Sequence, residues 1–166
     1  MPELFDIVDS NDSVIGQATR QECHTNKNLI HRGVDIFIFN SKGQLLLQKR
    51  SMKKDLYPGL WASSSSGHLD SGEAYEEAAE RELFEELGIK AELKPVTKYR
   101  CFLEKESEID VLFKGKHDGP FSINKEEIDE ARFFSMGYIK EKMAAEPEMF
   151  SAGFRKAFRV YIGEDE

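Results

Sequence analysis

Hydrophobic residues alternate with polar ones, or run together, in several short stretches that predict β-strands. Near the N-terminus this pattern predicts a hairpin over residues 3 to 18, with its turn at residues 9 to 12. In residues 34 to 39 apolar side chains occupy both alternating sets of positions, which predicts a strand, opened by His31, that is covered on both faces. Further strands are predicted at residues 44–50, from Trp61 onward, and at 90–103, 109–114 and 131–135.

A helix is predicted in the middle of the chain, where apolar residues recur every four positions. Ala79, Leu83 and Leu87 fall on one stripe of this helix. Gly88 follows as a residue that can end the helix in the left-handed conformation. Candidates for the cap at its start are Asp70 and Ser71.

Three more segments complete the pattern. Residues 20 to 29 are polar and are expected to form a loop or a short helix, and helices are predicted at residues 137–145 and 149–161. The last helix carries an aromatic stripe, which we interpret as part of the core: Phe150, Phe154, Phe158 and Tyr161. Strands on both sides of one central helix, with a closing helix, predict an α/β fold in which helices sandwich a mixed sheet.

Composition limits the class of protein. A chain of 166 residues is expected to form one domain over residues 1–166, with a core at about 30–163 and the hairpin packed on it. The net charge of −8 argues against binding to nucleic acid or to an anionic membrane, and no run of apolar residues is long enough to span a membrane. Two cysteines, Cys23 and Cys101, provide no disulfide framework, so a cytoplasmic location is expected. A homodimer is compatible with these features.

Three carboxylates of the central helix are predicted to share one face. Glu82, Glu85 and Glu86 lie at i, i+3 and i+4, and like charges at this spacing repel each other. Clustered carboxylates are ligands that Mg²⁺ or Mn²⁺ prefers, so a metal site is one interpretation. The alternative is an acidic helix face exposed to solvent.

The densest basic cluster of this acidic chain comes just before the central helix. It consists of Lys49, Arg50, Lys53 and Lys54. Near an acidic metal site, Arg50 and Lys54 could hold the phosphates of a substrate. Taken alone, the cluster is more typical of a solvated strand end.

The spacing of the residues around the three glutamates resembles the signature of a known family. Gly67, Glu73, the run Arg81-Glu82-Leu83, the pair Glu85-Glu86 and the pair Gly88-Ile89 match the Nudix box at every specified position. The resemblance implies an α/β/α sandwich with a mixed sheet and a catalytic loop-helix-loop. It also implies metal-dependent hydrolysis of a small-molecule substrate, a diphosphate linked to a nucleoside, by attack of water at phosphorus.

Roles for individual residues follow from this resemblance. Glu82, Glu85 and Glu86 would bind Mg²⁺ or Mn²⁺ together with the carbonyl of Gly67, and Arg81 would pair with Glu73 or Glu77. The expected catalytic group is therefore Glu85, Glu86, Arg81 and Glu73. The general base stays open among Glu85, Glu86, Glu126 and Glu127.

Within the superfamily the chain looks closest to the isopentenyl diphosphate isomerase branch. Five residues have a spacing similar to that of the metal ligands in this isomerase. The resemblance implies that they form a second metal site: His24, His31, His68, Glu106 and Glu108. Two departures weigh against the isomerase reaction, because Ser66 stands where the isomerase has a cysteine and Glu82 stands where it has an arginine. Cys23 adjoins His24 and is an alternative source of a thiol. We therefore expect a hydrolase, with isomerisation as the alternative and a non-catalytic binding module as a third interpretation.

Overall fold

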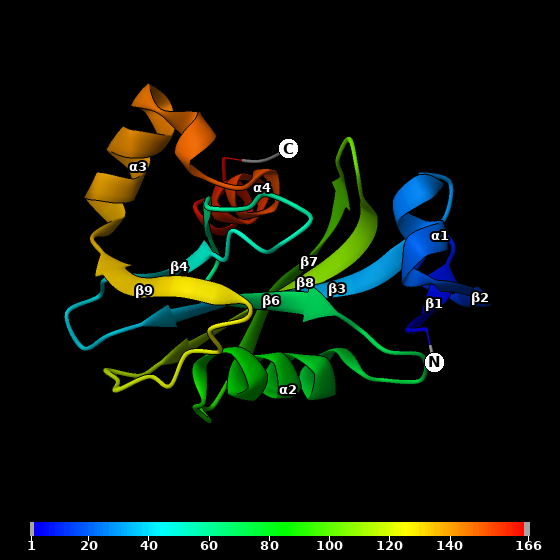
Figure 1. Cartoon of the computed structure of the whole chain (residues 1–166), viewed down its shortest axis with the longest axis horizontal. Helices are drawn as coiled ribbons and strands as arrows, with labels where there is room; N and C mark the ends of the chain where they lie inside the picture. Colours follow the sequence, from blue (N-terminus) through cyan, green and yellow to red (C-terminus); the bar gives the residue numbers. More distant parts are fainter. Residues whose placement is uncertain (1, 165–166) are drawn as a thin grey trace.

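The computed structural model describes residues 2–164 and shows a mixed sheet with helices on both of its faces (Figure 1). Helix α2 covers one face, and α4 with α3 covers the other, so the predicted α/β sandwich is confirmed. The strands are β1 (Leu4–Val8), β2 (Val14–Thr19), β3 (His31–Phe39), β4 (Leu45–Arg50), β5 (Trp61–Ala62), β6 (Ser65–His68), β7 (Lys94–Phe102), β8 (Ser107–Lys116) and β9 (Ile128–Phe134). The helices are α1 (Arg20–Thr25), α2 (Tyr75–Leu87), α3 (Met136–Ala145), a 3₁₀ turn η1 (Pro147–Met149) and α4 (Ala152–Tyr161).

Strand β3 is the centre of the seven-stranded sheet. It pairs in parallel with β8 along its whole length, and its first half pairs antiparallel with β6 on the other side. Strand β4 follows β3 after a short turn but pairs with it only at Phe39 and Leu45, and then runs between β5 and β9. This divergence opens the middle of the sheet, and β6 fills the gap beside β3.

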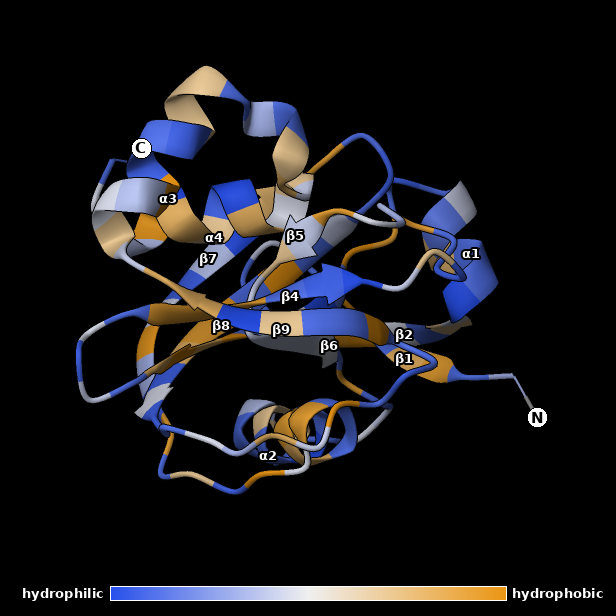
Figure 2. Cartoon of the chain, turned by 60° about the vertical axis from the view of Figure 1, so that its left-hand side comes forward, coloured by the Kyte–Doolittle hydropathy of each residue, from blue (hydrophilic) through white to orange (hydrophobic). Residues whose placement is uncertain are grey.

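Two apolar cores lie on opposite faces of the sheet. On one face Val34 and Ile36 of β3 pack with Leu83 of α2, and on the other face Phe37 packs with Phe154 of α4. Alternate residues of β3 therefore belong to different cores, which explains why the strand is apolar on both sides. Helix α2 correspondingly carries both hydrophobic and hydrophilic segments (Figure 2).

The aromatic stripe near the C-terminus is core, as the sequence predicts. Phe150, Phe154 and Phe158 are each no more than 2% exposed, and Tyr161 packs partly buried against them. The helix itself is shorter than predicted, however. It begins at Ala152 because the Ser151 hydroxyl accepts a hydrogen bond from the backbone N–H of Phe154.

Two other boundaries differ from the prediction. Helix α2 begins at Tyr75, so neither Asp70 nor Ser71 caps it; instead the Glu77 carboxylate accepts a hydrogen bond from the N–H of Ala74. Strand β9 begins at Ile128, three residues earlier than expected, because Ile128 is fully buried and pairs with the end of β4. The predicted left-handed end of α2 at Gly88 is confirmed.

The N-terminal hairpin forms its own two-stranded sheet, which docks beside β3 and α1 (Figure 1). Its turn is held by Asp12, whose carboxylate accepts hydrogen bonds from Arg32, Tyr75 and Lys98. These three partners come from β3, α2 and β7, so a single carboxylate ties the hairpin to both layers around it. Among residues 2–164, no helix combines the length and apolar character needed to cross a membrane.

Candidate active site

Strand β6 separates two groups of polar side chains, because successive residues of a strand point to opposite faces. On the side of α2, the Ser65 hydroxyl donates to Glu86 at 3.0 Å, and Gly67 lies directly against Glu82. On the other side, the ring of His68 lies 5.0 Å from that of His31. One short strand thus positions both predicted metal sites.

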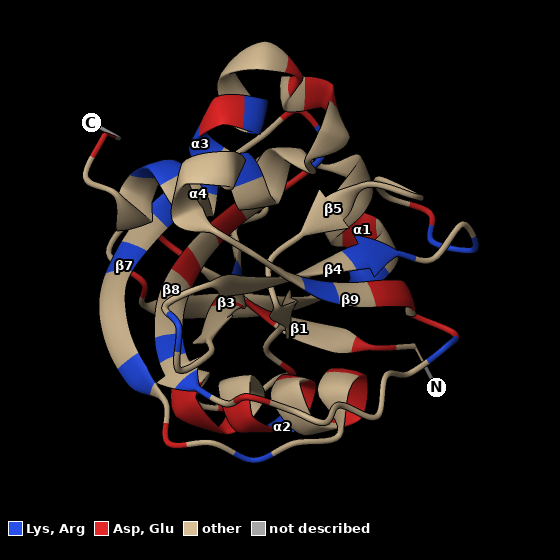
Figure 3. Cartoon of the chain, turned by 90° about the vertical axis from the view of Figure 1, so that its left-hand side faces the viewer, with Lys and Arg blue, Asp and Glu red and all other residues tan. Residues whose placement is uncertain are grey.

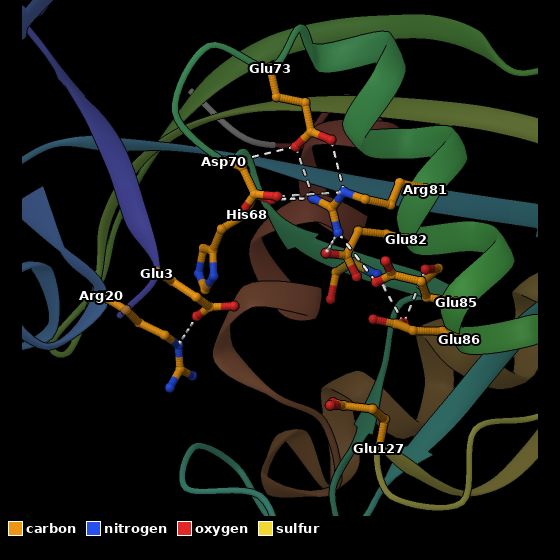
Figure 4. Close-up of polar contacts among 12 residues, drawn as sticks. Glu3, Arg20, His68, Asp70, Glu73, Arg81, Glu82, Glu85, Glu86 and Glu127 are labelled. Carbon is orange, nitrogen blue, oxygen red and sulfur yellow. Dashed lines mark hydrogen bonds and ion pairs between the residues drawn. The ribbon is translucent and has the colours of Figure 1, made fainter. Parts of the chain in front are cut away.

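Arg81 organises the carboxylates beside α2 (Figure 4). Its guanidinium binds Glu73 through two hydrogen bonds of 2.8 and 2.9 Å and also donates to Glu82 at 2.7 Å and Glu85 at 3.3 Å. A further bond of 2.9 Å reaches the backbone carbonyl of His68. Of the two partners left open by the sequence, Glu73 is therefore the one that pairs with Arg81. The hydrogen bonds from Arg81 lower the pKa of Glu73.

Glu86 is the most buried of the three glutamates, at 8% exposed. One of its oxygens accepts hydrogen bonds from the Gln48 side chain at 2.8 Å and from Ser65. Burial raises the pKa of Glu86 well above its usual range, and the neighbouring charge of Glu82 adds to this effect. Gln48 lies outside the motif and was not predicted from the sequence; its signal there is a lone polar residue after three leucines in a predicted strand.

Gly67 is required by the close approach of Glu82. A Cβ atom at Gly67 would lie 2.3 Å from Cδ of Glu82 and 2.4 Å from its Oε1. The absence of a side chain therefore lets a carboxylate of α2 press against β6.

The second predicted group also comes together, from four separate segments of the chain. Nitrogen atoms of His24, His31 and His68 lie within 4.8 Å of one another, as do ligand atoms of His68, Glu106 and Glu108. The Oε1 atom of Glu108 lies 3.7 Å from Nε2 of both His31 and His68. The pairing of β8 with β3 places Glu108 opposite His31, and Glu106 lies just before β8 begins.

Several nitrogens of this second group have no hydrogen-bond partner among residues 2–164. Nε2 of His24 and both ring nitrogens of His31 are buried without a hydrogen bond. Burial and the nearby charge of His68 lower the pKa of His31 to about 3, so its ring is neutral near pH 7. Neutral, unpartnered imidazole nitrogens are available as metal ligands.

Members of both groups line one cavity of about 790 Å³: Glu82, Glu85 and Glu86 from the first, and His68, Glu106 and Glu108 from the second. Of the predicted basic cluster, Arg50, Lys53 and Lys54 also line it. Lys54 pairs with Glu127 and Lys53 with Glu126, so the candidate phosphate ligand and a candidate base are in contact. Figure 3 shows acidic segments along α2 and a basic segment at the end of β4.

The alternative thiol suggested by the sequence does not lie in the cavity wall. Cys23 is 1% exposed and packs against Phe5 in the core of the N-terminal hairpin, and it is not among the described residues that line the cavity. Ser66 does line the cavity, and so does Cys101, to which the sequence analysis assigned no role.

Comparison with known proteins gives a consistent result. The model of the NUDIX domain family matches residues 29–153. The chain is 36% identical to isopentenyl-diphosphate Delta-isomerase 2 of Photorhabdus laumondii over 94% of its own length and 90% of the relative. It is 35% identical to an uncharacterised Nudix hydrolase of Pseudomonas aeruginosa, over 96% and 94% of the two chains. A crystal structure from Deinococcus radiodurans has a TM-score of 0.85 and 28% sequence identity, and covers 95% of this chain and 98% of that chain.

Proposed function

The chain belongs to the NUDIX domain family, and from that membership we propose that it hydrolyses a diphosphate bond in a nucleoside diphosphate-linked substrate with Mg²⁺ or Mn²⁺. The observation that carries this proposal is the gathering of Glu82, Glu85 and Glu86 on one cavity wall around a single arginine. Three carboxylates with one cation leave a negative site, and a divalent ion would balance it.

The donor set fits a hard divalent ion. Glu82, Glu85, Glu86 and the Gly67 carbonyl would hold it with oxygen ligands, which Mg²⁺ and Mn²⁺ prefer. A bound divalent ion polarises the phosphate and offsets its negative charge. The second group, with His24, His31 and His68, offers nitrogen ligands as well and suits Mn²⁺ or another transition metal.

Three further roles remain: accepting the proton, positioning the carboxylates and binding the phosphates. Among the candidate bases, Glu86 is 8% exposed, and Glu126 and Glu127 pair with Lys53 and Lys54. The Glu85 side chain is 54% exposed on the cavity wall, so we assign to Glu85 the proton from the attacking water. Arg81 holds Glu82 and Glu85 in register, which makes it a positioning residue. Arg50 and Lys54 would bind the outer phosphates, since both line the same cavity.

Isomerisation of isopentenyl diphosphate is the alternative function. The convergence of the histidine and glutamate side chains in the second group favours it, as do the names of several relatives. It requires a positioned acid for protonation of an alkene, however, and Ser66 has a hydroxyl that is a far weaker acid than a thiol. Glu82 would also repel a diphosphate at the position where the isomerase has an arginine. We therefore favour hydrolysis.

A substrate screen with a matched pair of variants tests the proposal. The purified protein, with Mg²⁺, Mn²⁺ or a chelator, is assayed on nucleoside triphosphates, nucleotide sugars, coenzymes and isopentenyl diphosphate. Glu86→Gln should lower kcat on the best substrate by a factor on the order of 10³, because it removes ligand charge. Glu80→Gln changes an exposed glutamate of the same helix and should retain activity.

Two results would contradict the proposal. One is near-normal turnover by Glu86→Gln. The other is conversion of isopentenyl to dimethylallyl diphosphate by the unmodified protein with no diphosphate hydrolysis. We expect no isomerisation by Ser66→Cys either, because Glu82 still occupies the position of the diphosphate-binding arginine.

A further inference from the structure

The cavity reaches from α2 to the start of α4, and the proposed hydrolysis uses only part of it. Glu82 of α2 and Gly153 of α4 both line it, although these two helices cover opposite faces of the sheet (Figure 1). Its volume of about 790 Å³ lies in the range of roughly 300–1,000 Å³ that is typical of pockets for whole small molecules. Space therefore remains beyond the proposed metal site for another part of the substrate.

Uncharged residues form the cavity wall at the start of α4. Hydrogen bonds join the loop of residues 51–60 to this helix, since the N–H of Ser151 donates to the carbonyl of Trp61 at 2.9 Å and the N–H of Leu60 donates to that of Tyr57 at 3.3 Å. Five residues of the loop and the helix line the cavity, and we define them as its α4 end: Leu56, Tyr57, Ser151, Gly153 and Phe154.

Arg50 connects the α4 end to the proposed phosphate site. Its Nε–H donates to the carbonyl of Leu56 at 2.9 Å, so the guanidinium assigned to an outer phosphate lies directly against the α4 end. A group carried by that phosphate therefore meets an uncharged wall. Contact with apolar surface is the main way in which such a wall binds a ligand.

Tyr57 is held toward this end by an uncommon backbone conformation. Its φ angle is 52°, in the left-handed region that bulky side chains rarely adopt. Burial raises the pKa of its phenol, and the charge of Arg155 in α4 partly offsets this effect, which places the side chain near that helix. A half-buried aromatic ring beside an open cavity offers a surface on which another ring can stack.

Gly153 leaves open space at the α4 end. Its backbone is not in the left-handed region, and a Cβ atom there would meet nothing within 4 Å apart from its chain neighbours and the backbone of its own helix. Gly67 differs in this respect, because its absent side chain makes room for Glu82. The packing of the protein does not fill the space over Gly153, so a side chain at this position would project into the cavity.

We propose that Gly153 sets the size of the group accepted at the α4 end, and that a ring-sized group, a base or a sugar, occupies the space over it. This inference rests on the proposed function, in which Arg50 binds the outer phosphate. The ring on that phosphate would pack against Leu56 and Tyr57. A short group on the same phosphate would leave the space to water and forgo these contacts.

Three diphosphates with one substituent each test the proposal. They carry methyl, cyclohexylmethyl or adenosine on one phosphate, and hydrolysis of each releases inorganic phosphate, so a single assay serves all three. The wild-type protein should show a kcat/KM at least about tenfold higher for both ring-containing compounds than for methyl diphosphate. Gly153→Leu should bring both ratios to near one, and Gly153→Ala should give intermediate ratios.

Gly137→Leu is the matched control. Gly137 is the second residue of α3 as Gly153 is of α4, each helix has a serine at its N-cap, and a Cβ at Gly137 likewise meets nothing within 4 Å. Gly137 is exposed, however, and does not line the cavity. The control therefore reproduces the change in helix propensity and should keep the wild-type ratios.

The outcomes separate this inference from the proposed function. If the wild-type protein hydrolyses all three compounds equally, or if Gly153→Leu keeps the wild-type ratios, the size-selective end is refuted while hydrolysis stands. An equal loss of preference in Gly137→Leu also refutes it. If no compound is hydrolysed, the proposed function fails, and the same ratios are read from dissociation constants by titration calorimetry. Should Gly153→Leu fail to fold, the wild-type and Gly153→Ala ratios decide the question.

Discussion

Substitution of Gly67 by alanine should damage the proposed metal site without unfolding the protein. The added Cβ atom would lie 2.3 Å from Cδ of Glu82, where ordinary van der Waals contacts begin at 3.4 Å. The Glu82 carboxylate must therefore move by about 1 Å, away from its 2.7 Å hydrogen bond to Arg81. A displacement of about 1 Å at a reacting centre typically costs on the order of a hundredfold in rate.

The stability cost should be small, because the three atoms nearest the new Cβ all belong to the flexible side chain of Glu82. Loss of a partly exposed ion pair costs about 1 kcal/mol or less. We therefore expect Gly67→Ala to lower kcat about a hundredfold while the free energy of unfolding changes by about 1 kcal/mol. Steady-state kinetics, binding of Mn²⁺ by calorimetry and urea denaturation measure the three quantities.

The matched control is Gly16→Ala in β2, where no atom lies within 4 Å of the new Cβ. It should retain activity, metal affinity and stability. If Gly67→Ala had the kcat and the Mn²⁺ affinity of the wild-type protein, activity and metal binding would not require the position of the Glu82 carboxylate against β6. A large loss of stability with unchanged activity of the folded fraction would equally refute the reasoning.

Two further predictions concern charge. Lys54→Ala should raise KM more than it lowers kcat, and the defect should shrink with added salt, because salt also screens the attraction in the wild-type protein. The control Lys42→Ala changes an exposed lysine and should leave KM unchanged. An unchanged KM in Lys54→Ala would indicate that the basic cluster is only a solvated strand end. Burial opposes ionisation of Asp12, but hydrogen bonds from Lys98 and Arg32 lower its pKa below 3.8 overall. Ionised Asp12 therefore stabilises the fold above that pH, and this contribution is lost as the pH falls through the lowered pKa. Asp12→Asn should therefore lower the free energy of unfolding at pH 7 and have less effect near pH 2, as urea denaturation at both pH values would show.

Local sequence was sufficient to predict the helices and strands and one of the two side-chain groups, that of Glu82, Glu85 and Glu86. The stripe of Ala79, Leu83 and Leu87 specifies which face of α2 is buried, and Gly88 specifies where the helix ends. Glu82, Glu85 and Glu86 then share a face by helical geometry alone. These features depend on spacings of a few residues, which the sequence displays directly.

Boundaries that depend on capping or pairing were predicted less well. The start of α2 was placed on the wrong residues, because the bond that caps it comes from Glu77 inside the helix. The start of β9 was placed too late, because its first residues are ordered by pairing with β4. The boundary of β9 is decided by a strand distant in the sequence, about which composition near the boundary carries little information. The cap of α2 is a local bond, and the cap candidates chosen from composition were simply the wrong residues.

The second group depends on tertiary structure. For the group of His24, His31, His68, Glu106 and Glu108, the sequence supplied only a resemblance in spacing. The contacts exist because β3 lies between β6 and β8 in one particular register, with His31 opposite Glu108 and Gly33 opposite both His68 and Asp110. A shift by one residue would turn each side chain to the other face of the sheet. Periodicity determines which residues share a face within one element, whereas the register between distant strands is decided by packing of the whole core.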